Sequence, residues 1–129
     1  MAFEFSHYAV KISRVAGADL SALQYTFVKL STTDTVVTCT AATDIPIGVL
    51  QNAPTSGQEA EVLIVGGTKL TAGATIAIGN ILGVTATGTA SVLTVSDTTK
   101  YVLGSAISGG ASAEIITAVI NCANPTRAN

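Results

Sequence analysis

Two stretches of the sequence decide the fold: "IPIGVLQNAPTSGQEAEVLIVGG" at residues 45–67 and "YVLGSAISGGASAEIITAVIN" at residues 101–121. Each begins with an apolar run, reaches a glycine (Gly48 or Gly104), passes a small polar turn and closes with a β-branched run. Short β-branched runs bounded by turn residues are typical of β-strands. The two stretches therefore predict the same hairpin, built twice.

An Ala-Glu pair precedes the final run of each stretch. The pair is Ala60 and Glu61 in the first stretch, and Ala113 and Glu114 in the second. A position that occurs twice is poorly suited to a unique reactive site. We therefore interpret both glutamates as structural residues at the start of a strand.

The rest of the chain also consists of short Val-, Ile- and Thr-rich runs, with turn residues between them. Turn signals about every ten residues favour an all-β domain, a small barrel or a sandwich of short antiparallel strands. The only helical signal is one turn, "LSALQ", which Asp19 is placed to cap. Strands are predicted at residues 24–30, 35–41, 45–50, 59–66, 74–78, 80–86, 90–96, 101–106 and 112–121.

Two of these strands are apolar on both faces. Side chains alternate across a strand, yet in residues 61–65 and 114–120 apolar side chains occupy both alternating sets. A strand with one face in water should alternate apolar with polar residues. We therefore expect each strand to be covered by the core on one face and by a neighbouring subunit on the other. The predicted subunit-interface residues are Leu63, Val65, Ile115 and Val119.

The N-terminal segment differs from the rest, because it holds two of the three phenylalanines and the only histidine. Two interpretations stay open: an edge strand of the domain, or an arm that folds onto a partner. Phe3, Phe5 and Tyr8 are the expected anchors of such an arm on its partner, since buried aromatic side chains dominate interface energetics. We divide the chain into an arm, a β-domain and a flexible polar tail, at residues 1–18, 19–123 and 124–129.

The composition limits the kinds of partner. The 129-residue chain is 48% hydrophobic and 11% charged, with a net charge of −2; soluble domains usually have about 25% charged residues. The cations are scattered, so no basic stripe exists to neutralise phosphates, and direct nucleic-acid binding is not expected. No apolar run approaches the roughly 18 residues of a membrane span, so no membrane is expected. A charge-poor chain can cover its surface with Thr, Ser, Asn and Gly, or it can bury much of that surface against copies or partners. Both explanations fit this sequence, and the second favours an assembly of subunits.

The chain offers little for catalysis, which needs groups of tuned acidity close together. His7 is the only histidine, and most acids stand beside turn residues, where they cap turns. Cys39 and Cys122 lie in apolar runs and are predicted to be small buried hydrophobes, which can pair if their strands are neighbours. Two cysteines and one histidine do not make a zinc site. We predict no enzyme activity, metal, cofactor or small-molecule substrate.

Four segments together carry a resemblance: "AGADLSALQYTFVKL" (16–30), residues 45–67, "LTAGATIAIGNILGVTATGTA" (70–90) and residues 101–120. They show an early Asp-Leu-Ser, a Gly-Val-Leu-x-Asn-x-Pro hairpin and a final strand pair. In order and spacing the segments resemble the small capsid decoration (cement) proteins of tailed bacteriophages.

The resemblance implies a β-tulip or small-barrel domain that binds the outside of a mature phage head. It implies a homotrimer that contacts the major capsid protein, with no catalytic residues. The expected location is the outer capsid surface of the virion, after synthesis in the host cytoplasm. The alternative is a receptor- or glycan-binding β module of a phage tail or bacterial surface. The absence of Trp and the low aromatic content, 5%, count against that alternative.

Overall fold

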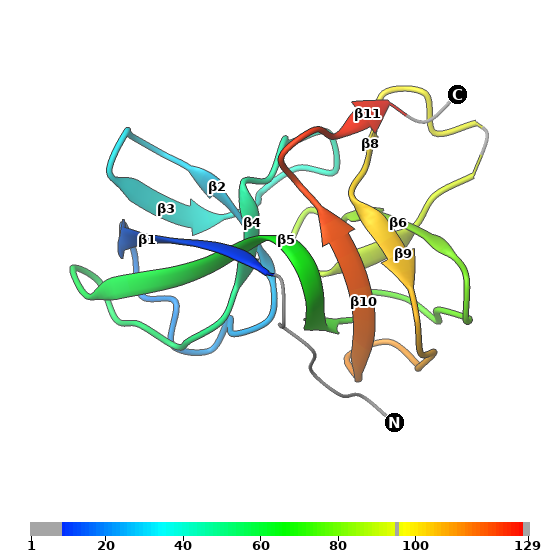
Figure 1. Cartoon of the computed structure of the whole chain (residues 1–129), viewed down its shortest axis with the longest axis horizontal. Helices are drawn as coiled ribbons and strands as arrows, with labels where there is room; N and C mark the ends of the chain where they lie inside the picture. The colour runs from blue at the N-terminus through cyan, green and yellow to red at the C-terminus, as the bar shows by residue number, and fades with distance from the viewer. Residues whose placement is uncertain (1–8, 95, 128–129) are drawn as a thin grey trace.

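The computed structural model describes residues 9–94 and 96–127, and these residues form an all-β structure (Figure 1). The all-β prediction is confirmed, since the described part of the chain contains no helix. None of it could cross a membrane as a helix. The strands are β1 (Val10–Ala16), β2 (Phe27–Leu30), β3 (Thr35–Thr38), β4 (Gly48–Leu50), β5 (Glu59–Thr71), β6 (Ile81–Val84), β7 (Ala90–Val92), β8 (Tyr101–Val102), β9 (Gly104–Ala106), β10 (Ile115–Asn121) and β11 (Thr126–Arg127).

Five strands close into a ring in the order β1-β3-β2-β4-β5, because β1 also pairs with β5. The pairing of β1 with β3 is parallel, whereas the other four contacts are antiparallel. The ring is therefore of mixed pairing, and the antiparallel prediction is wrong at this one contact.

The long strand β5 leads from this ring into a second group of strands. Its first part pairs with β1 and β4, and its later part, from Val65 onward, pairs with β10. The sheet then continues through β9 and β6 to β7. A parallel bridge between Ala72 and Ala90, with the amide of Gly73 donating to the carbonyl of Ala90 at 2.8 Å, brings β7 back to the end of β5. Figure 1 shows the two groups side by side.

The two groups are copies of one architecture, which we call the first lobe (residues 10–65) and the second lobe (residues 66–121). Their turns before β5 and β10 match in detail. The amide of Gln58 donates to the carbonyl of Thr55 at 3.0 Å, and the amide of Glu114 donates to that of Ala111 at 3.1 Å. In each turn the side-chain oxygen of the last residue accepts the amide of the first. A spacing of 56 residues relates the two turns.

The same spacing relates the two hairpin glycines. A Cβ on Gly48 would overlap the carbonyl oxygen of Leu63, and one on Gly104 would overlap that of Val119. Both glycines thus let one strand approach the backbone of the next, which explains why both stretches contain them. Leu63 and Val119 are consequently equivalent positions.

The strand pairs earlier in each lobe match with a spacing of 54 residues. Phe27 pairs with Val49 as Ile81 pairs with Ser105, and Leu30 pairs with Val36 as Val84 pairs with Ala90. The whole domain is therefore duplicated.

This register corrects the predicted match between the two Ala-Glu pairs. Glu114 caps its turn as Gln58 does, so it is equivalent to Gln58. Glu61 is paired with Ser13, as Thr117 is paired with Lys69. The two glutamates therefore occupy non-equivalent positions in the two lobes, and the Ala-Glu pair occurs in both stretches by coincidence.

The lobes have separate cores that use alternate faces of the same strand. Ala60 and Val62 of β5 lie in a cluster inside the first ring. Leu63, on the opposite face, belongs to a larger cluster that fills the second lobe and its junction with the first. This larger cluster also contains Cys39 and Cys122, which are both free and buried.

The structure corrects both ends of the predicted domain. Residues 10–16 form β1, which pairs with β5 over residues 10–15 and with β3 at Val15 and Ala16, and so closes the first ring. These residues are therefore part of the β-domain, neither a free arm nor an edge strand. At the C-terminus, β11 pairs with β8, so residues 126–127 are not a loose tail. Residues 1–8 and 128–129 lie outside the described residues.

Two local predictions also change. Residues 74–78 form no strand, although Ile76 makes an isolated bridge with Gly110. The segment after Asp19 forms turns rather than a helical turn. Asp19 nevertheless caps it, since its carboxylate accepts the amide of Ser21 at 3.1 Å.

Candidate interaction surface

An apolar open surface lies on the outer face of β6, β9 and β10, which we call the second wall. Ile81, Ser105 and Val119 stand in one row across these strands, because Ser105 is in register with both of the others. Ile81 is 44% exposed and Val119 is 40% exposed. Ile115 and Ile107 are also exposed, and the amide of Ile107 is bonded to the carbonyl of Thr117, between Ile115 and Val119 on β10.

The equivalent surface of the first lobe, which we call the first wall, is closed. Its row consists of Phe27, Val49 and Leu63, and all three are fully buried. The second lobe covers them. The amide of Phe27 donates to the carbonyl of Gly88 at 2.7 Å, and Gly88 packs so closely that a Cβ there would overlap the hydroxyl of Thr38. One architecture thus has a covered wall in one lobe and an open wall in the other.

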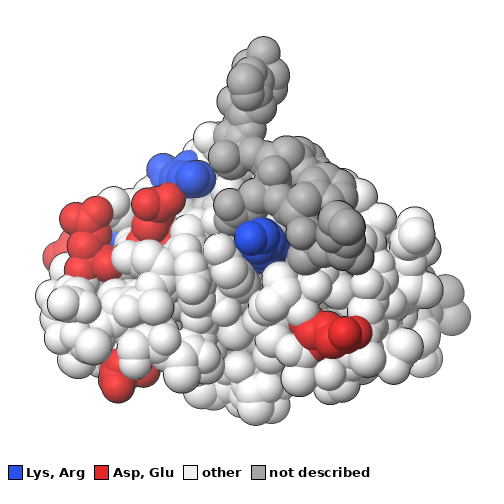
Figure 2. All heavy atoms as spheres, turned by 90° about the horizontal axis from the view of Figure 1, so that it is seen from below, with Lys and Arg blue, Asp and Glu red and all other residues white. Residues whose placement is uncertain are grey.

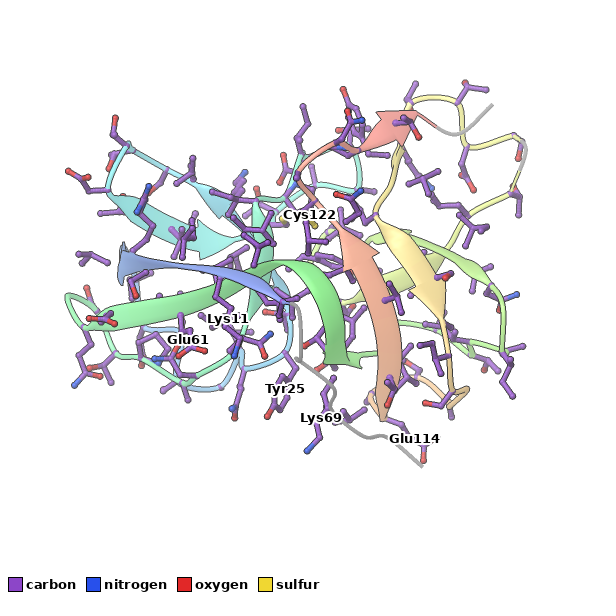
Figure 3. The ribbon with its side chains drawn as sticks, viewed as in Figure 1. Lys11, Tyr25, Glu61, Lys69, Glu114 and Cys122 are labelled. Atoms are coloured by element: carbon purple, nitrogen blue, oxygen red, sulfur yellow. The ribbon has the colours of Figure 1, made fainter. Side chains whose placement is uncertain are left out.

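Charged side chains are sparse around the second wall. Lys69 lies on β5, the strand next to β10, where it is in register with Thr117. Its ammonium lies 5.8 Å from the ring centroid of Tyr25. Figure 3 shows these two side chains together, with Glu114 at the start of β10. In Figure 2 the displayed face is mostly uncharged, with charges as isolated patches. The wall is thus suited to a partner with an apolar surface.

Three other cations belong to local ion pairs. Lys11 reaches Glu61 at 3.2 Å, Lys29 reaches Asp44 at 2.9 Å, and Lys100 reaches Asp97 at 2.9 Å. Hydrogen bonds from Lys100 and from the amide of Thr94 lower the pKa of Asp97, so it stays ionised. These groups hold turns and strands in place, as predicted for acids beside turn residues.

The four predicted interface residues have different environments. Leu63 has no exposed surface and packs inside the chain, so the prediction of a subunit contact there is corrected. Val65 is half-buried near the junction of the lobes. Ile115, at 39% exposure, and Val119 lie on the second wall and remain candidates for an interface. Phe3, Phe5 and Tyr8, the predicted capsid contacts, lie outside the described residues.

Sequence reasoning missed Ile81 and Ile107 as surface residues. Ile81 lies in the predicted strand 80–86, whose apolar character gave no sign of which face would be open. Aligning the two lobes would have found it, because Ile81 is equivalent to Phe27. The comparison identifies a position that is apolar in both lobes yet covered in only one.

The described residues show no arrangement for catalysis. No group of three or more His, Cys, Asp or Glu among them could hold a metal. Burial raises the pKa of the Cys39 and Cys122 thiols to about 12 each, which keeps them protonated and unreactive. A shallow groove of about 510 Å³ at the far end of the first lobe is lined by Ser13, Arg14, Val15, Asp34, Gly57 and Glu59. There the exposed Ser13 hydroxyl donates to the Glu59 carboxylate at 3.0 Å. Among the described residues, the lining of this groove contains no histidine and no cysteine.

Comparisons with known proteins address the fold. No family model matches the chain. No curated protein matches it either. Among solved structures, the N base of head fiber gp8.5 from bacteriophage phi29 is similar, with a TM-score of 0.68 and 22% identity. The similarity covers 88% of this chain and 95% of that chain. The two proteins share a fold.

Proposed function

We propose that the protein is a structural component of a tailed-phage head, a decoration protein that binds the outer capsid surface as a homotrimer and stabilises the expanded shell. The observation that carries this proposal is the shared fold with the phi29 head-fiber base, across nearly the whole of both chains. The resemblance of residues 16–120 to capsid decoration proteins points the same way.

The surface chemistry supports a binding role over an enzymatic one. The second wall offers exposed Ile and Val side chains with little charge nearby, which suits docking on a protein surface. The proposed partners are the major capsid protein and further copies of this chain. Phe3, Phe5 and Tyr8 are proposed to anchor the N-terminal segment on the shell, and Ile115 and Val119 to take part in contacts between subunits.

Binding alone can stabilise a shell under internal pressure. A protein that binds the expanded lattice, and not the precursor, stabilises it by RT ln(1 + [L]/Kd) for each site, or about 2.7 kcal/mol at a hundredfold excess over Kd. Many sites act on one shell, so modest affinity at each is enough. The mechanism requires a rigid body with contact surfaces and no reactive group.

The test uses heads that lack this protein. We expect them to assemble with normal geometry and to burst at a lower temperature than complete heads. Purified protein added back should restore the bursting temperature and should bind expanded heads far better than unexpanded precursors. Equal binding to both forms, or an unchanged bursting temperature, would remove the stabilising role and favour the receptor- or glycan-binding alternative.

A further inference from the structure

The contact between the two lobes shows what the first wall binds. It receives one end of the second lobe, formed by the β6–β7 turn and the end of β5. Besides the bond from Phe27 to Gly88, the amide of Thr71 donates to the carbonyl of Tyr25 at 2.8 Å. Val84, at this end of the second lobe, is only 2% exposed. An apolar wall and the end of a ring therefore fit each other in this fold.

Each half of that contact has an unoccupied equivalent elsewhere in the chain. The second wall, with Ile81 and Val119 exposed, is the equivalent of the first wall. The corresponding end of the first lobe, which we call the first end, carries Leu30 at 46% exposure and Val15 at 41%. Leu30 is equivalent to Val84, by their pairings with Val36 and Ala90. The chain thus exposes one receiving surface and one inserting surface.

We propose that the second wall binds the first end of another copy of this chain, in a head-to-tail contact that repeats the contact between the lobes. The occupant is a second copy because the chain itself carries the matching end, with its apolar residues left exposed. Such a contact joins two different surfaces, so it must either close into a ring or extend into a fibre. The proposed homotrimer is the ring of three, and only the copy number rests on the proposed function.

Two differences in sequence set the strength of this contact. Asp34 lies in the β2–β3 turn at the position that Gly88 occupies in the β6–β7 turn, and Arg14 stands where the second lobe has Leu70. A side chain at the Gly88 position would overlap Thr38, so Asp34 holds the incoming end further from the wall. The contact between copies is therefore more polar and looser than the one between lobes, and it should be reversible on dilution.

The experiment measures mass in solution with two variants. Ile81→Asp places a charge on the second wall, and Leu30→Asp places one on the first end; each should weaken self-association at least about tenfold. Wild-type protein should form a homo-oligomer of 12.9 kDa subunits, and each variant should be monomeric. Ile45→Asp is the control, because Ile45 is 57% exposed and belongs to neither surface.

Mixing the two variants gives the decisive result. The Ile81→Asp variant has an unchanged first end, and the Leu30→Asp variant has an unchanged second wall. When mixed, the two variants should form this one contact and no further contact, which gives a 1:1 dimer. Thermal unfolding checks that each variant is folded, and Val119→Asp with Val15→Asp provides a second pair. A monomeric wild-type chain, normal assembly of Leu30→Asp, or a mixture that stays monomeric would overturn the proposal. Head binding by a monomeric variant tests the proposed function separately.

Discussion

The first part of β5 and the strand β10 occupy the same place in their respective lobes, yet their outer faces meet different surroundings. Leu63 is buried by the second lobe of its own chain, whereas its equivalent, Val119, is 40% exposed. Both strands are apolar on both faces in the sequence. An apolar outer face thus shows that a strand is to be covered, and it does not show whether the cover comes from the same chain or from another.

Matched truncations of the two equivalent residues should give the largest difference. Leu63→Ala should lower the free energy of unfolding by about 2–5 kcal/mol, because it leaves a cavity in a closed core. Val119→Ala should cost less than about 1 kcal/mol in the isolated chain, since its side chain is partly in water. Denaturant unfolding at low protein concentration measures both. Equal losses would mean that the second wall is already covered within the chain.

The hairpin glycines test whether the duplication is physical. Gly48→Ala and Gly104→Ala should each cost about 1–3 kcal/mol or more, and by similar amounts, because each new methyl group meets a backbone carbonyl that cannot swing aside. Thermal unfolding of the two variants provides the comparison. A large cost at one glycine with none at the other would break the equivalence of the lobes.

The matched turns give a smaller effect with opposite signs. Gly57 and its equivalent Ala113 both have positive φ, at 85° and 73°. Gly57→Ala has open space around the new methyl group, so its cost of about 1 kcal/mol is backbone strain alone. Ala113→Gly should stabilise the protein by up to about 1 kcal/mol, since the strain disappears and only chain entropy opposes it. Destabilisation by Ala113→Gly would show that strain at this turn is negligible.

The fold class and the repeated hairpin could be predicted from the sequence, because a glycine, a polar turn and a β-branched run follow one another in the same order in both stretches. Sequence reasoning missed the wider duplication. The matched positions are 56 residues apart in the hairpins and 54 in β2 and β3, and matched side chains have diverged as far as Lys29 and Gly83. The two lobes share their strand pairing and hydrogen bonds but few residue types, so their equivalence cannot be read from the sequence.

The covered and open walls could not be told apart from the sequence for a different reason. The junction depends on Gly88, which lets the β6–β7 turn reach Phe27, and on a long strand that carries one lobe around to the other. These are properties of two segments far apart in the chain. The role of residues 10–16 was equally hidden, since β1 gains its place only by closing the ring.

The most direct test of the account is thiol labelling at the second wall. Cys39 and Cys122 should not react with the label at pH 8, because burial raises the pKa of each thiol to about 12 and keeps it protonated. A single Val119→Cys variant should react rapidly as a dilute monomer and should become protected in the oligomer and on expanded heads. Equally fast labelling in all three states would show that the wall stays open and would contradict its role as the interaction surface.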